Sequence, residues 1–434
     1  MLLPLPFSLY YGGGDHNAFL ISAGITIVVG FIAFRSTKLS GEVRAREGFA
    51  IVTLGWVSFS LFGCLPFLIS GQIPSFTDAF FETMSGFTTT GATILPDIER
   101  LPHGILFWRS FTHWLGGMGI IVLSLAILPF LGVGGMQLFK AEVPGPVPDK
   151  LKPRVTETAK ILWGVYMGIS GIETLLLLIG GMDLFEALCH TFGTMATGGF
   201  STKNASIGHY DSAYIEYVIT FFMLAAGTSF ALHYRALRGE VRAYLRSHEF
   251  RLFLGLLAGA TLLIGGGLFL HHEGALEPAF RMAVFQVASI LTTTGYGTAD
   301  FERWSVTAQM ILFGFMFIGG CAGSTGGGMK VARLLVLVNF GRVEVKRLLH
   351  PRGVIPIRIG ETVVPRDVAM NILGFLVLML LLFFAGVLAF SLLGYDWITS
   401  FGAIAATLGN IGPGFGMVGP TDNYAHVPIL GKWM

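Results

Sequence analysis

Long apolar stretches alternate with short polar ones along most of this 434-residue chain. A bilayer core about 30 Å thick is crossed by roughly 20 apolar residues in a helix. Eight stretches have suitable composition, near residues 18–34, 49–71, 104–133, 159–181, 213–234, 251–270, 307–339 and 368–394. The pattern predicts an all-α integral membrane protein.

Four shorter apolar runs each end in a glycine-bearing tract: TTTGAT at 88–93, ATGGFS at 196–201, TTTGYG at 292–297 and GNIGPG at 409–414. When the tracts are aligned on one glycine each, apolar residues recur at helical spacing before the glycine in all four copies. This is a fourfold internal repeat. The run at 76–87 gives about 18 Å of helix, too short to span. Each repeat therefore predicts an outer helix, a half-length pore helix, a glycine tract and an inner helix.

A segment that enters and leaves on one side of the membrane puts irregular backbone at membrane depth. Such backbone is tolerated only where protein encloses it or it lines a water-filled cavity. Four such segments predict a pseudo-fourfold pore. Small residues that merely allow close helix packing are the alternative reading, which four aligned copies disfavour.

The tracts carry no carboxylate, imidazole or thiol, so backbone carbonyls and Thr or Asn oxygens remain as ligands. Such oxygens suit an alkali cation, because a carbonyl ring can replace its hydration shell, and glycine permits the positive φ that this requires. The partly negative C-terminal ends of the half-helices also favour a cation. We expect a selective ring of four glycines with a Thr/Asn ring beneath it. The predicted filter residues are Thr89, Thr90, Gly91, Thr197, Gly198, Gly199, Thr293, Thr294, Gly295, Asn410, Ile411 and Gly412.

A second glycine-rich stretch, IGGCAGSTGGGMK at 318–330, interrupts the third inner helix. Each glycine costs up to about 1 kcal/mol relative to alanine in a helix, so the helix should break here. We predict a gate below the filter, with Lys330 placing a positive charge there; a simple kink with Lys330 reaching the interface is the alternative. The predicted gate residues are Gly323, Ser324, Thr325, Gly326, Gly327, Gly328 and Lys330.

Composition and charge support a membrane protein and give its orientation. The chain is 53% hydrophobic and only 12% charged, with a mean hydropathy of +0.70. Most Lys and Arg residues fall in 35–48, 140–160, 235–251 and 330–366, which alternate with the glycine tracts. By the positive-inside rule these loops are cytoplasmic and the tracts face the other side. We expect a multi-pass protein of the cytoplasmic (inner) membrane, contacting lipid and no nucleic acid.

Several ionisable residues fall in apolar surroundings, where they are functional candidates. Glu82 lies nine residues before its glycine, and His190, Gln286 and Ala403 occupy the matching positions. We interpret these as ties that brace the half-helices rather than as ion ligands. Arg109 and His113, four apart, are expected to pair with an acid near the outer rim. Glu216 is a further candidate of this kind, and Glu173 is the only acid central to a predicted span.

The motifs resemble those of the Trk/Ktr/HKT superfamily of potassium transporters, and most of all its bacterial TrkH type. The resemblance rests on DAFFETMSGFTTTGAT at 78–93, WLGGMGIIVLSLAILPFLGVGGMQLFKAEVPGP at 114–146, IGGCAGSTGGGMK at 318–330, KRLLHPR at 346–352 and AATLGNIGPGFG at 405–416. It implies a homodimer with one pore per subunit, potassium as the transported ion and no organic cofactor. It also implies a gate loop in the third inner helix and a TrkA-like cytoplasmic nucleotide-binding regulatory subunit, docking on 134–160, 235–251 and 340–366.

The chain departs from this family at both ends. The apolar run before Gly12 is short, and the residues after Gly412 hold no spanning run. We therefore expect a sequence trimmed at both ends, with the last inner helix missing. The predicted organisation is 1–48, an N-terminal extra helix and loop; 49–146, 147–247 and 248–352, three pore repeats, the third with the gate; and 353–434, an incomplete fourth repeat.

Together these patterns predict gated potassium uptake through a filter of backbone carbonyls. A secondary transporter that couples potassium to protons or sodium is the alternative, since carriers also use broken helices near the midplane. Parallel repeats favour the pore, and Glu173 is the one candidate for a coupling site. No nucleophile and base occur at a plausible helical spacing, so we expect no enzyme.

Overall fold

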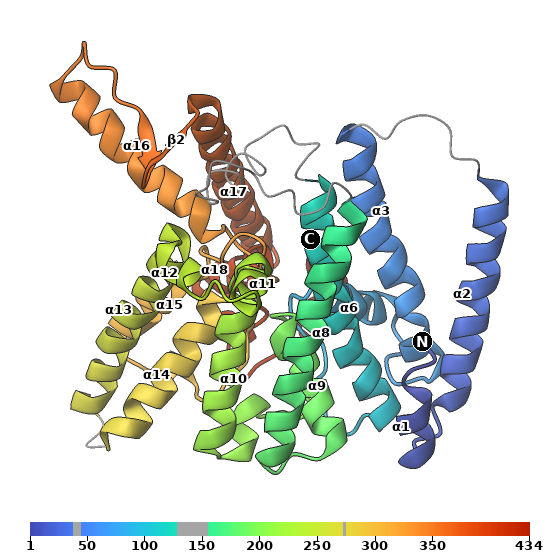
Figure 1. Cartoon of the computed structure of the whole chain (residues 1–434). Coiled ribbons are helices and arrows are strands. Elements are labelled where there is room, and N and C mark those ends of the chain that lie inside the picture. Colours follow the sequence, from blue (N-terminus) through green and yellow to red (C-terminus); the bar gives the residue numbers. More distant parts are fainter. Residues whose placement is uncertain (38–44, 128–154, 272–274) are drawn as a thin grey trace.

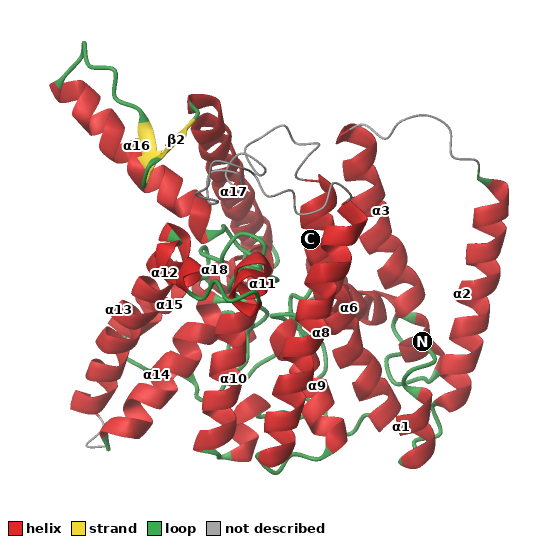
Figure 2. Ribbon diagram, viewed as in Figure 1, coloured by secondary structure: helices red, strands yellow, loops and turns green. Residues whose placement is uncertain are grey.

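The computed structural model describes residues 1–37, 45–127, 155–271 and 275–434. Helices make up most of this part, as Figure 2 shows. The first half contains α1 (Leu5–Tyr10), α2 (His16–Ser36), α3 (Ala45–Gly63), α4 (Leu65–Ile69), α5 (Phe76–Phe87), α6 (His103–Ile127), α8 (Val155–Ile179), α9 (Leu184–Met195), η1 (Ser206–Tyr210), α10 (Ala213–Ala226) and α11 (Phe230–Leu237).

The second half contains α12 (Arg242–Arg246), α13 (His248–His271), α14 (Leu276–Leu291), η2 (Phe301–Arg303), α15 (Val306–Phe315), α16 (Val331–Leu349), β1 (Ile357–Ile359), β2 (Thr362–Val364), α17 (Arg366–Ser391), α18 (Trp397–Leu408), η3 (Gly416–Val418) and α19 (Ile429–Lys432). The long helices run roughly side by side, and α16 and the start of α17 lie toward the upper end of Figure 1.

Fewer long spans are described than the eight predicted. Five helices are long and apolar enough to cross a membrane: His16–Ser36, Glu47–Ile69, Thr158–Ile179, His248–Leu270 and Arg366–Ser391. A sixth is the pair α10 and α11, if its 100° bend is counted within one span. The predicted span 307–339 is instead two helices, α15 and α16, joined by the glycine-rich segment. α6 covers the predicted span 104–133 as far as Ile127, and residues 128–133 lie outside the described residues.

Four shorter helices, α5, α9, α14 and α18, end where the glycine tracts begin. Local chemistry defines the start of two of them: Ser75 Oγ accepts from the backbone N–H of Asp78, and Asp183 from that of Glu186. Such caps satisfy N–H groups that have no partner within the helix. The half-length helices predicted from apolar spacing are thus present in all four copies.

The structure is mostly helical, as predicted, but one short β-hairpin departs from the all-α prediction. β1 and β2 pair antiparallel, with Ile357 opposite Val364 and Ile359 opposite Thr362. The IRI and TVV segments are rich in β-branched residues, which suit strands, and Gly360 between them has a positive φ of 59°. Buried Ile357 and Val364 pack into one cluster with apolar residues of α16 and α17.

The core is apolar, and the outward faces are apolar as well. Cys64, Cys189 and Cys321 are buried free thiols that pack in this core. Many large hydrophobic side chains of α2 and α17 are exposed, including Phe34 at 79% and Leu392, just beyond α17, at 80%. In water such faces would be unfavourable, so they are surfaces for lipid.

Candidate functional site

The four glycine tracts share one backbone conformation. Two residues before each aligned glycine, a residue with a side-chain oxygen has a positive φ: 58° at Thr89, 52° at Thr197, 60° at Thr293 and 62° at Asn410. The glycines follow at 81° for Gly91, 75° for Gly199, 82° for Gly295 and 100° for Gly412. Non-glycine residues rarely adopt positive φ, so four matched occurrences indicate a backbone that the surrounding fold imposes.

The tracts also meet one another in a closed cycle. A Cβ atom added at Gly91 would overlap the carbonyl oxygen of Gly198 in the second tract. The same addition at Gly199 would overlap the carbonyl of Thr294, and at Gly295 that of Ile411. At Gly412 it would lie 2.8 Å from the carbonyl oxygen of Thr90, which returns to the first tract. Each glycine thus faces the carbonyl that precedes the next glycine of the cycle.

Residues with side-chain oxygens stand two positions before each glycine of this cycle. Thr89, Thr197 and Thr293 are completely buried. Asn410 joins the fourth tract to the first: its Nδ2 donates to the carbonyl of Thr88 at 3.0 Å, and its Oδ1 accepts from the hydroxyl of Thr90 at 2.5 Å. The predicted filter residues are therefore gathered at one place.

Three of the four pore helices are tied to their own tract by the residue nine positions before the glycine. The backbone N–H of Ile94 donates to Glu82 at 2.9 Å, and that of Thr298 donates to Gln286 at 3.4 Å. His190 Nε2 lies 3.0 Å from Ser201 Oγ. Ala403 has no polar group for such a tie. These bonds agree with the bracing role read from the sequence.

Arg109 extends the brace between the first two repeats. Its Nε lies 2.6 Å from Glu82 Oε1, with both side chains buried, and its Nη1 donates to the carbonyl of Ser201 at 2.9 Å. The guanidinium also lies 3.6 Å from the centre of the Phe200 ring, which stacks on His113. Arg109 thus pairs with an acid of a pore helix, whereas His113 packs beside it.

The segment between α15 and α16 lies against the ends of three pore helices. Thr325 Oγ1 donates to the carbonyl of Met195, the last residue of α9, at 3.0 Å. The backbone N–H of Gly327 donates to Thr293 Oγ1 at 2.6 Å. A Cβ at Gly327 would lie 2.9 Å from the carbonyl of Gly409, at the end of α18. The predicted gate therefore sits directly below the Thr/Asn level.

The Lys330 side chain folds back onto the gate segment. Its Nζ donates to the carbonyl of Gly326 and lies 3.3 Å from Ser324 Oγ. The alternative in which Lys330 extends to the interface does not describe this conformation. The predicted gate residues Gly323 to Gly328 thus form one unit with Lys330.

Three contacts around the site were not found from the sequence. Glu249 Oε1 accepts from the backbone N–H groups of Ala322 and Ala332, at 2.6 and 3.0 Å, on either side of the gate segment. The sequence offered one signal for Glu249, because it is an acid at the start of a span within a basic segment. At the fourth tract, the hydroxyl of Tyr424 donates to the carbonyl of Gly412 at 3.0 Å. Glu302 accepts from the N–H of Gly416 at 2.6 Å, and burial raises the pKa of this carboxyl.

The chemistry available here is coordination by neutral oxygen. Among the described residues, no group of three or more His, Cys, Asp or Glu side chains could hold a metal ion. The cycle of tracts presents carbonyl and hydroxyl oxygens, the ligands that replace water around an alkali cation. These features, together with the apolar spans, are those of a multi-pass membrane transport protein.

Comparison with known proteins gives the family. The model of the TrkH family, described as a cation transport protein, matches residues 15–429. The Trk system potassium uptake protein TrkH of Halomonas elongata is 43% identical over 438 residues, covering all of this chain and 90% of its own. The protein of the same name from Escherichia coli K12 is also 43% identical, over 441 residues with the same coverage.

A solved structure agrees with these sequence matches. The crystal structure of the potassium transporter TrkH from Vibrio parahaemolyticus superimposes with a TM-score of 0.91 at 38% identity, covering this whole chain and 90% of that one. The chain belongs to the TrkH family of cation transport proteins. The predicted resemblance, the transport rather than enzymatic role and the multi-pass membrane location are confirmed.

Proposed function

We propose that this chain takes up potassium across the cytoplasmic membrane through a filter of backbone carbonyls. The closed cycle of four tracts carries the proposal, because each of the carbonyls of Thr90, Gly198, Thr294 and Ile411 lies against the glycine of a neighbouring tract. The relatives named as potassium transporters support the choice of ion. Uptake then follows the membrane potential, about 2.3 kcal/mol per charge per 100 mV.

The gate segment supports a second element of the proposal, control of flow below the filter. Its contacts with Met195, Thr293 and Gly409 put backbone against three of the four repeats, on the side that we expect to be cytoplasmic. We take this arrangement as the closed state. Opening requires the hydrogen bonds of Thr325 and Gly327 to break, while those of Glu249 can hold the two ends of the segment.

Regulation and assembly complete the proposal. A homodimer with one pore per subunit, regulated by a TrkA-like nucleotide-binding subunit on the basic loops, fits the family and the charge pattern. Of the predicted docking loops, 235–251 and 340–366 are described, whereas most of 134–160 lies outside the described residues. The repeat boundaries at 49, 147, 248 and 353 stay predictions.

Growth at low external potassium tests the proposal. Cells that lack their own potassium uptake should grow at limiting potassium when they express this chain together with its cognate regulatory subunit. Membrane insertion is measured in parallel by fractionation, so that poor expression is recognised. Failure to restore growth despite normal insertion would count against potassium uptake.

One observation keeps the coupled carrier as a second candidate. Glu173 of α8 is fully buried, and neither carboxylate oxygen has a hydrogen-bond partner within the described part of the chain. A buried acid within a membrane span is the kind of group that carriers use to bind a proton. The same position, however, also suits a neutral packing role beside α9.

A further inference from the structure

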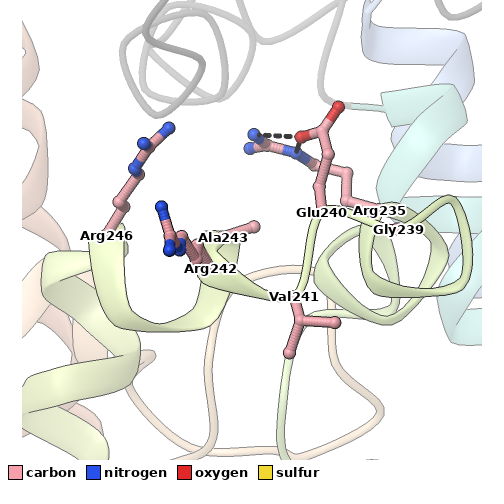
Figure 3. Close-up of a pocket in the computed structure, with 7 residues that line it drawn as sticks. All are labelled: Arg235, Gly239, Glu240, Val241, Arg242, Ala243 and Arg246. Carbon is pink, nitrogen blue, oxygen red and sulfur yellow. Dashed lines mark hydrogen bonds and ion pairs between the residues drawn. The ribbon is translucent and has the colours of Figure 1, made fainter.

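A basic cleft lies on the cytoplasmic side, apart from the filter and gate. Its volume is about 400 Å³, and its lining residues are Arg235, Gly239, Glu240, Val241, Arg242, Ala243 and Arg246. Figure 3 shows the guanidinium groups of Arg242 and Arg246 on one side of the segment, with Val241 pointing to the opposite side. The cleft therefore has a charged side and an apolar side.

Its charge is only partly neutralised. Glu240 accepts from both Nε and Nη2 of Arg235, at 2.9 and 2.7 Å. No acid of the described residues forms an ion pair with Arg242 or Arg246, one turn apart on α12. Two arginines at this spacing present donors for a phosphoryl group, which guanidinium binds in a bidentate manner. The cleft is thus complementary to a singly charged phosphate ester.

The position of the cleft selects a membrane lipid as the source of that phosphate. α12 ends one residue before α13, a membrane span, so it lies at the boundary of the bilayer. Leu237, Val241 and Leu245 are 75%, 64% and 70% exposed, and each immediately precedes an arginine. Exposed apolar side chains beside arginines are the pattern of an interfacial segment on anionic lipid.

The same segment is joined to the gate at both ends. Before it, the backbone N–H of Phe230 donates to the carbonyl of Gly323 at 3.0 Å. After it, Glu249 holds Ala322 and Ala332. Within it, His233 Nδ1 lies 2.6 Å from the hydroxyl of Tyr244, which joins α11 to α12. A ligand that orders the cleft therefore acts on a unit that directly contacts the gate.

We propose that the cleft formed by Arg235, Arg242 and Arg246 binds the headgroup of an anionic phospholipid of the cytoplasmic leaflet. Occupancy stabilises the α11–α12 unit and so changes the gate equilibrium, a consequence that rests on the proposed pore function. An arginine at an anionic membrane surface contributes about a fivefold change in affinity. Arg242→Gln with Arg246→Gln should therefore weaken lipid binding by roughly 20-fold.

The test measures binding before transport. The purified full chain is reconstituted with phosphatidylcholine and phosphatidylglycerol, and retained lipid is counted by native mass spectrometry. The wild type should retain phosphatidylglycerol in preference to phosphatidylcholine, and the double variant should lose this preference. Arg342→Gln with Arg352→Gln removes the same charge from exposed positions outside the cleft and should keep it.

Transport gives a separate readout. Potassium flux of the wild type should depend on phosphatidylglycerol content, and that of the double variant should not. Equal lipid retention by the double variant and the wild type would overturn the proposal. Binding of millimolar inorganic phosphate to the cleft in pure phosphatidylcholine would also overturn it, because the ligand would then be a soluble anion and not a lipid. Normal lipid retention by the wild type without any flux would instead refute the pore function alone.

Discussion

At the scale of single residues, the glycines of the cycle are required for two reasons at once. Gly412 has a φ of 100°, which a side chain disfavours, and it lies against the carbonyl of Thr90 with no room for a Cβ. Either reason would favour glycine. The lack of room for a Cβ is specific to the carbonyl cycle, because it depends on the distance between two tracts. The positive φ depends only on the backbone conformation of one tract.

Replacing Gly412 by serine separates these two effects. Gly412→Ser should push the fourth tract away from the first, widen the carbonyl cycle and lower potassium over sodium permeation by about tenfold, the equivalent of roughly 1.4 kcal/mol. Ion competition in a flux assay measures this ratio. Gly181→Ser is the matched control, because Gly181 has a φ of 95° but open space around it. If selectivity is unchanged in Gly412→Ser, this glycine does not belong to the filter.

At the scale of elements, the pore helices are held in place by polar side chains rather than by packing alone. Glu82 of α5, Arg109 of α6 and the carbonyl of Ser201 form one buried chain that joins the first repeat to the second. A buried ion pair is weak evidence for net stability, but breaking it leaves an uncompensated charge. The Glu82–Arg109 pair therefore fixes the first repeat relative to the second. Its effect on stability appears only when one partner is removed.

This asymmetry predicts the effect of neutralising Glu82. Glu82→Gln leaves the Arg109 guanidinium buried without its counter-charge and should destabilise the protein by about 3–5 kcal/mol. Glu277→Gln breaks the Arg281 pair, in which Glu277 is 53% exposed, and should cost less than about 1 kcal/mol. Unfolding in detergent, followed by fluorescence, gives both values. Similar losses in the two variants would mean that the buried brace has no special weight.

The gate segment allows a prediction of the opposite kind, a gain of function. Thr325→Val keeps the side-chain shape but removes the hydrogen bonds to the carbonyls of Met195 and Ala226. One such bond contributes about 1 kcal/mol. The population of the closed state relative to the open state should therefore fall at least about fivefold, and basal potassium flux should rise. Thr220→Val, which removes a bond within α10 only, is the control. An unchanged basal flux would indicate that the segment does not close the pathway.

The sequence was informative about these elements wherever one local rule decided the structure. Apolar spacing placed the pore helices, and glycine density located the break before Val331. Contacts between distant segments had no such rule. Nothing near Tyr424 indicates that its hydroxyl reaches Gly412, and nothing in ALHYRAL indicates the 100° bend before α11. The hairpin at Gly360 was missed because two three-residue strands give little periodic signal.

At the scale of the whole molecule, the arrangement separates functions along one axis. The basic helix α16 lies at the upper end of the molecule in Figure 1, and the pore helices α9 and α14 begin at the lower end. The carbonyl cycle follows the C-terminal ends of the pore helices, and the glycine-rich segment leads from it into α16. An ion moved by the membrane potential through such a path needs no titratable group, whereas a proton-coupled carrier does. Glu173 is therefore the residue that distinguishes the two mechanisms.

Replacing Glu173 distinguishes a pore from a proton-coupled carrier. Glutamine preserves the size of the side chain and removes its ability to bind and release a proton. If the chain is a pore, Glu173→Gln should leave potassium flux within about twofold of the wild type. A twofold change corresponds to only about 0.4 kcal/mol of activation free energy. A pH gradient imposed at zero membrane potential should then drive no potassium accumulation in proteoliposomes of either protein. If the gradient drives uptake in the wild type and Glu173→Gln abolishes it while the variant remains folded, potassium is coupled to protons. The four tracts would then form a binding site of a carrier, because a path open to both sides at once cannot store the energy of a proton gradient.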